Sequence, residues 1–500
     1  MGLSLLLRKF ILPSILLLSG CNDIGKNDTG AQDLSPVGID TSGIPSDMNS
    51  FSLIDPWTGD LDGMEKRRII RILTVYGPGR FYLDGAVGRG IVAEMSNRFE
   101  EHLNKKLGRG HVKIQVVNIP VARDQLIPAL LSGYGDLISA DLTKTNERLE
   151  LVDFSVAASK PVSEILITGP SAPKIKDIED LSGEILYIRG SSSYFESVVR
   201  LNQRLAEAKK PPASIELVSE LLEDDDLIEM VNGGLLPWAI VDDYKPLLWK
   251  GVFQDIQVRK DIVFRERGSL AWAMRKNSPL LQKLVNEFLE KNREGTLIGN
   301  ILHNRYIRDF DYAGNALKNE DYRRFEEVVD LFRHYGQKYG VDYLLAAAQG
   351  YQESRLNQSM RSPAGAIGIM QLLPSTAKDP NVGIEEIFEV EANIHAGIKY
   401  LHFIRNRYFS NSEITPLDQT FLALAAYNAG PARVRDLRKK AKKAGYDPNV
   451  WFDNVELIAA QEIGRETVQY VANIYKYHLT YQLVANQQLK HRSARVEAGL

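Results

Sequence analysis

The sequence predicts a multidomain chain in which an α/β domain is followed by a mainly α-helical domain. At 500 residues the chain is too long for a single hydrophobic core. Between residues 69 and 310, short apolar segments typical of strands alternate with amphipathic helical segments. From residue 320 to 488, apolar residues recur with helical spacing and strand patterns are almost missing. The change near residues 310–320 therefore predicts a boundary between two fold classes.

The composition is that of an ordinary globular protein, with 44% hydrophobic and 25% charged residues and a formal net charge of -3. This balance gives no support for nucleic-acid binding, which favours a basic face. The 8 histidines are scattered without the spacing of metal ligands. We therefore expect neither a metal site nor a cofactor.

Residues 1–20 are predicted to be a signal peptide. Arg8 and Lys9 precede an apolar run from Phe10 to Leu18, which is short for a permanent membrane span but suits the core of a signal peptide. The following Cys21 is the only cysteine and ends the segment "LSGC".

This segment resembles the bacterial lipobox, which implies cleavage before Cys21 and lipidation of its thiol. Asn22, rather than Asp, follows the cysteine, and by the same resemblance this favours the periplasmic face of the outer membrane. An ordinary signal peptide followed by a chance cysteine is the alternative. Residues 21–68 are rich in Gly, Ser, Asp, Asn and Pro, so we expect a lipidated flexible tether.

The α/β domain begins with the strand pattern "IIRILTVYG" at 69–77. A helical segment follows at 90–108, and a second strand pattern, "VKIQVVNI", lies at 112–119. Such alternation predicts a mainly parallel sheet covered by helices.

The segment "LLSGYGDLISADLTKTNERLELVDFS" (130–155) resembles the family 3 periplasmic solute-binding proteins. The resemblance implies that Arg148 clamps a ligand carboxylate and that Thr143 adds a hydrogen bond. A guanidinium group matches a carboxylate with two parallel hydrogen bonds, which supports this role. The alternative is that Arg148 only pairs with Glu147 or Glu150 on a helix surface.

Two further segments resemble the second lobe of these proteins. "LYIRGSSSYFE" (186–196) resembles a strand and turn that open a helix, and its Ser191 and Ser192 would favour an anion there. "WAIVDDY" (238–244) resembles the strand whose terminal aspartate meets a ligand amino group, and Asp243 is the better match.

The chain departs from that family at Trp238, where the family often has aspartate, and in its two successive aspartates. Tyr82 is our candidate for the early aromatic ligand contact. Over residues 69–308 the resemblance implies a two-lobed, periplasmic-binding-protein-like domain.

In the helical half, "GVDYLLAAAQGYQES" (340–354) predicts a helix that begins at Asp342 and ends near Glu353. A carboxyl group beside apolar side chains is desolvated, which raises its pKa and suits it to act as a general acid. The alternative is a solvated glutamate at a helix end.

Five segments occur in order: "QESRLN" (352–357), "GIMQLLPSTA" (368–377), "NIHAGIKYL" (393–401), "AAYNAGP" (425–431) and "ETVQYV" (466–471). Together they resemble the catalytic domain of soluble lytic transglycosylases, a mainly α, lysozyme-like domain related to goose-type lysozyme. With the α/β half and the lipobox, the whole chain resembles the membrane-bound lytic murein transglycosylase F family.

The resemblance implies that Glu353 protonates the glycosidic oxygen between N-acetylmuramic acid and N-acetylglucosamine and later acts as a base. Ser354 would orient the carboxyl group or contact substrate. The remaining substrate-binding candidates are Met370, Gln371, Tyr427, Asn428 and Tyr470, of which Tyr470 is expected to bond near the carboxyl group. Glu466 is expected to be a structural partner.

Glycosidases that use water normally need two carboxylates, but these segments contain only one in an acid-like setting. In a lytic transglycosylase the 6-hydroxyl of muramic acid attacks its own anomeric carbon and forms a 1,6-anhydro end. The high effective molarity of this hydroxyl replaces the second carboxylate. The chain is thus expected to bind peptidoglycan glycan strands and cleave their β-1,4 bonds.

Two other functions stay open from the sequence. One is a lipid-anchored solute- or peptide-binding receptor with a non-catalytic helical domain, and the other is a lysozyme-type hydrolase. We also expect that a small wall-derived ligand of the α/β domain modulates cleavage. Residues 489–500 are expected to be a C-terminal tail.

Overall fold

The structure, a computed structural model, describes residues 55–84, 87–308 and 320–500. The predicted signal peptide, the lipidation of Cys21 and most of the predicted tether lie outside these residues. Helix α1 (Leu61–Arg67) falls within the range predicted as tether: the Asp60 carboxylate accepts a hydrogen bond from the Leu61 amide, and Met64 is buried. Along the described ranges, we find no helix with the length and apolar character needed to cross a bilayer.

The first lobe of the α/β domain is built on a five-stranded sheet. Its strands, in spatial order, are β4 (Gln115–Pro120), β1 (Ile69–Thr74), β5 (Leu137–Thr143), β12 (Leu270–Arg275) and β6 (Val152–Ala157). Helices α2 (Ile91–Lys106) and α8 (Pro279–Asn292) pack on one face, and α3 (Leu126–Leu131) packs on the other. All six residues of β1 are buried because both faces are covered.

The second lobe contains an antiparallel sheet and a separate parallel pair. The sheet has the order β10 (Trp238–Asp242), β7 (Val162–Thr168), β11 (Gln257–Gly268), and the pair is β8 (Ile185–Ile188) with β9 (Ser214–Leu217). Helices α5 (Ser193–Glu207) and α6 (Asp224–Asn232) contribute to its two hydrophobic cores. The predicted two-lobed α/β fold is confirmed.

The expectation of a mainly parallel sheet is wrong. In the first lobe β1 is parallel to β4 and β5, but β12 runs antiparallel to β5 and β6. The chain enters the second lobe after β6 and returns directly from β11 into β12, without the crossover helix that a parallel connection needs. Short elements complete the domain: β2 (Tyr82–Asp84), β3 (Val87–Arg89), α4 (Asn146–Leu151), α7 (Lys245–Leu248) and α9 (Leu297–His303).

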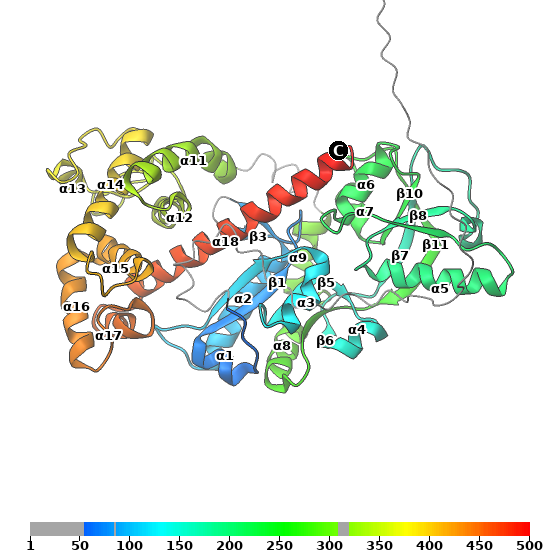
Figure 1. Cartoon of the computed structure of the whole chain (residues 1–500), viewed down its shortest axis with the longest axis horizontal. Helices are drawn as coiled ribbons and strands as arrows, with labels where there is room; N and C mark the ends of the chain where they lie inside the picture. Colours follow the sequence, from blue (N-terminus) through cyan, green and yellow to red (C-terminus); the bar gives the residue numbers. More distant parts are fainter. Residues whose placement is uncertain (1–54, 85–86, 309–319) are drawn as a thin grey trace, which may run out of the picture. The chain divides into compact units, whose positions relative to one another are not determined.

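Residues 320–500 are helical and contain no strand (Figure 1). The helices are α11 (Glu320–Tyr339), α12 (Tyr343–Ser354), α13 (Pro374–Lys378), α14 (Val390–Tyr408), α15 (Pro416–Ala429), α16 (Pro431–Lys443), α17 (Glu456–Glu462) and α18 (Arg465–Glu497). Helix α12 packs against both α11 and α18. Helix α18 continues well into the range predicted as a C-terminal tail, and Ala494 is buried there.

Candidate functional site

Helix α12 carries Glu353 in its last turn. The Asp342 carboxylate caps the start of the helix by accepting a hydrogen bond from the Leu345 amide at 3.0 Å. The helix ends directly after Ser354 because Arg355 and Leu356 both take left-handed conformations, with φ of 55° and 57°. Glu353 is thereby held at a fixed point beside a sharp change of chain direction.

The Glu353 carboxyl group is mostly buried and has one strong hydrogen-bond donor. Its Oε1 accepts a hydrogen bond from the Tyr470 hydroxyl at 2.6 Å. Burial raises the pKa of Glu353 to about 7, and the bond from Tyr470 opposes part of that rise. No further charged group of the described residues contributes to this shift. Glu353 can therefore hold a proton near neutrality and release it to a bound group.

Tyr470 reaches Glu353 from α18 and is itself buried. Its hydroxyl oxygen accepts a hydrogen bond from Nε2 of Gln349 at 3.1 Å. Burial raises the pKa of Tyr470 well above its ordinary value, so the hydroxyl stays protonated and acts as a donor. Helices α12 and α18, which are distant in sequence, thus connect Gln349, Tyr470 and Glu353 through two consecutive hydrogen bonds.

Ser354 is buried and bonded to the backbone. Its hydroxyl lies 2.9 Å from the carbonyl oxygen of Ile369 and 3.3 Å from that of Gly350, and it accepts a bond from the Asn357 amide at 3.1 Å. Ser354 therefore connects the end of α12 to the "GIMQ" segment. A contact between Ser354 and substrate stays a prediction.

Met370 belongs to the packed interior of the domain. It is fully buried, and a Cβ atom added to Gly397 would lie 2.5 Å from its side chain. Its amide donates to Oδ1 of Asn393 at 2.8 Å, and its carbonyl accepts from the Tyr427 hydroxyl at 2.8 Å. Tyr427 is only partly buried, so it joins this interior to the surface near Glu353.

Three predicted residues remain, Gln371, Asn428 and Glu466. Gln371 has a φ of 44°, which is strained for a side chain of this kind, and its amide group donates to the Gly368 carbonyl at 2.9 Å. Asn428 accepts a hydrogen bond from the Thr467 hydroxyl at 2.7 Å, which connects α15 to α18. Glu466, expected to be a structural partner, is exposed in the first turn of α18.

Sequence reasoning missed Gln349 and Asn393. Gln349 is fully buried and interrupts a run of small and apolar residues four positions before Glu353, a spacing that places both on one face of α12. That interruption was the available signal. Asn393 lies within a recognised segment, but its hydrogen bonds to the backbone of Ile367 and Met370 depend on the fold.

In the α/β domain, three predicted ligand residues line one small pocket. Thr143, Arg148 and Ser192 surround a space of about 20 Å³. The Arg148 guanidinium donates to the carbonyl oxygens of Thr143 at 2.8 Å and Ser191 at 2.9 Å, which joins the two lobes. Burial lowers the pKa of Arg148 to about 10.

Beside this pocket lies a buried ionic cluster that sequence reasoning missed. The Glu223 carboxylate lies 2.7 Å from Arg123, 3.3 Å from Arg189 and 3.4 Å from Arg80. Although burial raises the pKa of Glu223, these guanidinium groups lower it to about 2 overall. The signal was the acidic run that begins at Glu223, inside an otherwise apolar segment.

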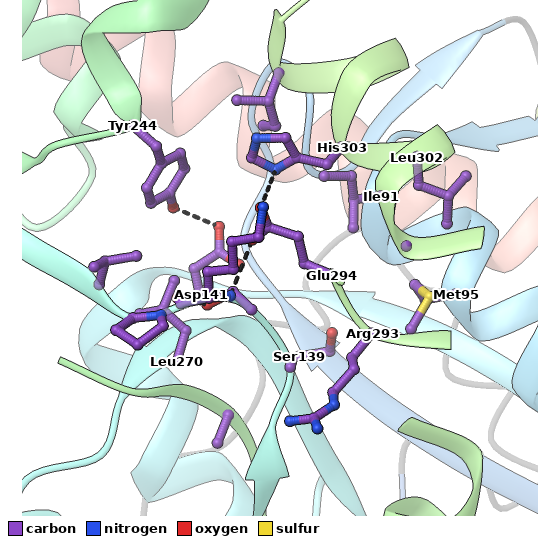
Figure 2. A pocket seen from close by; sticks show the side chains of 18 of the residues that line it. Ile91, Met95, Ser139, Asp141, Tyr244, Leu270, Arg293, Glu294, Leu302 and His303 are labelled. Carbon is purple, nitrogen blue, oxygen red and sulfur yellow. Dashed lines mark hydrogen bonds and ion pairs between the residues drawn. The ribbon is translucent and has the colours of Figure 1, made fainter. Parts of the chain in front are cut away.

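A larger cavity of about 330 Å³ lies between the lobes (Figure 2). Asp243 is among the residues that line it. Its apolar wall comes from Ile91, Met95, Leu270, Trp272 and Leu302. Figure 2 shows Tyr244 bonded to Asp141 at one side of the cavity, a hydrogen bond of 3.0 Å.

The two other predicted ligand residues of this domain lie elsewhere. The Ser191 hydroxyl donates to Glu220 at 2.5 Å, and Tyr82 pairs with Arg89 in the β2–β3 hairpin and lines neither space.

Comparison with known families divides the chain as the fold does. Residues 330–450 match the family described as Transglycosylase SLT domain, and residues 73–307 match bacterial extracellular solute-binding proteins, family 3.

Two curated relatives share most of their length with this chain. The membrane-bound lytic murein transglycosylase F of Shewanella frigidimarina (strain NCIMB 400) is 27% identical over 444 residues, covering 84% of this chain and 87% of the relative. The protein of the same name from Desulfosudis oleivorans (strain DSM 6200 / JCM 39069 / Hxd3) is 29% identical over 427 residues, covering 82% and 89%.

Among solved structures, the substrate-binding protein of an amino acid ABC transporter is similar at 18% identity and a TM-score of 0.39, covering 48% of this chain and all of that protein. A mutant of ArgBP from T. maritima has 14% identity and a TM-score of 0.40, covering 50% and 99%.

Proposed function

This chain belongs to the membrane-bound lytic murein transglycosylase F family and is a peptidoglycan lytic transglycosylase, and we propose that Glu353 is its catalytic acid and base. The observation that carries the proposal is the setting of this carboxyl group. It is mostly shielded from solvent, its pKa is raised to about 7, and among the described residues one neutral hydroxyl group, that of Tyr470, bonds to it. A carboxyl group of this kind is suited to proton transfer in both directions near neutral pH.

The proposed reaction needs no second carboxylate. Protonated Glu353 gives its proton to the oxygen of the β-1,4 bond between N-acetylmuramic acid and N-acetylglucosamine, and that bond breaks. The ionised carboxylate then takes the proton of the muramic acid 6-hydroxyl as its oxygen closes on the anomeric carbon. Tyr470 stabilises the carboxylate between the two steps, and the internal hydroxyl has a high effective molarity.

The mass of the products from digested murein sacculi tests this function. We expect glycan fragments with 1,6-anhydromuramic acid ends. Fragments that are one water heavier would assign the domain to the lysozyme-type hydrolases. No release of fragments at all would favour the receptor function, in which the helical domain is not catalytic.

We further propose that the α/β domain binds a small wall-derived ligand that modulates cleavage. The 330 Å³ cavity is within the size range of small-molecule sites, whereas the pocket at Arg148 holds about one water molecule. The cavity therefore has room for the body of a ligand, and Asp243 offers a carboxylate to an amino group.

Titration of the full-length protein with peptides released from sacculi tests this second proposal. We expect saturable binding that weakens in Asp243→Asn, because Asp243 lines the cavity, and in Arg148→Ala, because Arg148 joins the two lobes that enclose it, with a matching change in cleavage rate. If both variants bind and cleave as the wild type does, the domain is a spacer or docking module.

Anchoring by a lipid on Cys21 at the outer membrane is also a proposal, supported by the sequence alone and consistent with the name of the relatives. Fractionation of cells expressing Cys21→Ala tests it. We expect the variant to leave the outer-membrane fraction, and an unchanged distribution would refute lipid anchoring.

A further inference from the structure

Gln349 is a fully buried polar residue on α12, one helical turn before Glu353. Its Nε2 donates to the Tyr470 hydroxyl at 3.1 Å, while its Oε1 is buried and has no hydrogen-bond partner among the described residues. Packing alone would be served better by leucine or methionine, because a buried acceptor without a donor is a cost to folding. Of the two polar atoms of the Gln349 amide, Nε2 is the one that forms a hydrogen bond, and its partner is the Tyr470 hydroxyl.

The direction of this bond decides where the tyrosine proton goes. A hydroxyl group carries one proton, and an amide nitrogen can only donate. Because Gln349 donates to the Tyr470 oxygen, the tyrosine proton is left for Oε1 of Glu353, at 2.6 Å. The reverse orientation of the amide would draw the tyrosine proton to Gln349 and remove the donor from Glu353.

We propose that Gln349 is a positioning residue for the cleavage reaction, acting through Tyr470 to fix which oxygen of Glu353 carries the transferable proton. The inference rests on the proposed role of Glu353 as acid and base. With Oε1 receiving the tyrosine proton, the acid proton of Glu353 lies on Oε2. That oxygen accepts no hydrogen bond from the described residues, so it is available to the glycosidic oxygen.

The same arrangement supports the second step. Once Glu353 has lost its proton, the negative charge is stabilised by Tyr470, and a tyrosine that accepts a bond from Gln349 is a stronger donor. The bond from Gln349 lowers the pKa of Tyr470, in the direction this argument requires. Removing the amide should therefore weaken the Tyr470 bond and raise the pKa of Glu353.

A double-mutant cycle in the full-length protein tests the inference, with kcat and KM measured on soluble glycan strands across pH. We expect Gln349→Leu to lower kcat about tenfold, the effect of one hydrogen bond, with KM unchanged. Its alkaline limb of kcat should move to higher pH. Added to Tyr470→Phe, Gln349→Leu should have no further effect, because its partner is gone.

The matched control is Gln482→Leu, which removes another buried glutamine with an unpartnered Oε1, also from the helical domain. If Gln349→Leu matches this control in kcat and in pH profile while Glu353→Gln is inactive, the inference is wrong and the proposed function stands. Additive effects of Gln349→Leu and Tyr470→Phe would also overturn it. An active Glu353→Gln would instead refute the proposed function. Should Gln349→Leu not fold, Gln349→Met is interpreted in the same way.

Discussion

Two buried glutamates, one in each domain, have opposite acid–base properties. Glu353 lies beside neutral groups in the helical domain, and its pKa is raised to about 7. Glu223 in the α/β domain is more deeply buried, but three arginines surround it and its pKa falls to about 2. Burial favours the neutral acid, and only opposite charges reverse that preference. The charge of the neighbouring side chains therefore decides the role of each carboxyl group. Glu353 can exchange a proton near neutral pH, whereas Glu223 stays ionised and holds the two lobes together.

The largest effect is expected from Glu353→Gln, which keeps the shape of the side chain and removes its proton. We expect turnover to fall by about 10⁴-fold, because general acid catalysis is lost. Thermal unfolding at pH 4, and glycan binding, should stay close to wild type. Turnover within tenfold of wild type would place the catalytic acid elsewhere.

The corresponding change in the other domain, Glu223→Gln, should act on stability. Three guanidinium groups would lose their shared buried carboxylate, so the free energy of unfolding should fall by about 3 kcal/mol. Denaturant unfolding measures this change. The exposed Glu207→Gln in the second lobe is the control and should change it little. Equal stability of both variants would show that the cluster contributes nothing.

Tyr470→Phe removes the only donor to Glu353 among the described residues and should have an intermediate effect. A hydrogen bond to a charged group contributes about 2 kcal/mol, so we expect kcat to fall about 30-fold. The alkaline limb of kcat should move to higher pH, because the ionised form loses its donor. Tyr475→Phe changes a buried tyrosine of the same helix that packs on Phe421, and should leave both quantities unchanged.

The smallest expected effect is the change with pH in the stability that Glu353 contributes to the fold. The folded protein holds the Glu353 proton more tightly than the unfolded chain, whose glutamate pKa is about 4.3. The stability that Glu353 contributes is therefore present below pH 4.3 and lost as the pH rises through about 7. Glu223 behaves in the opposite way, since its contribution is present above pH 4.3 and lost as the pH falls toward 2.

At pH 8.5 the free energy of unfolding of Glu353→Gln should consequently be about 2 kcal/mol higher than that of wild type. This value allows for the partial exposure of the Glu353 side chain. At pH 4 the two proteins should be equally stable. Denaturant titrations at both values measure the difference. A difference of the same size at both pH values would mean that Glu353 is not held in its neutral form by the fold.

The sequence could predict the local part of the candidate catalytic site. Asp342 as a cap and Glu353 at the helix end follow from neighbouring residues, and the structure has both. The bond between Gln349 and Tyr470 joins residues 121 positions apart, so only the packing of α12 against α18 reveals it. The sequence shows Gln349 as a polar residue in an apolar run, but it does not indicate that Tyr470 is its hydrogen-bond partner.

The α/β domain was harder to predict from the sequence, because its key features also depend on contacts between distant residues. Strand and helix alternation predicted an α/β domain, and the resemblance to family 3 solute-binding proteins implied its two lobes. The direction of β12, however, depends on a return from the second lobe that no local pattern encodes. Arg148 was recognised from its own segment, whereas the arginines that surround Glu223 come from three separate turns of the chain. Residues that form such an ionic cluster have no characteristic spacing along the chain, so a single sequence does not reveal that they meet.

The central claim is that one buried carboxyl group suffices because the substrate supplies its own nucleophile. Digestion of sacculi in water enriched in ¹⁸O tests this claim most directly. The account predicts that wild-type enzyme releases 1,6-anhydro ends without ¹⁸O and that Glu353→Gln releases none. Reducing ends that carry one ¹⁸O atom would contradict it, since water would then be the nucleophile.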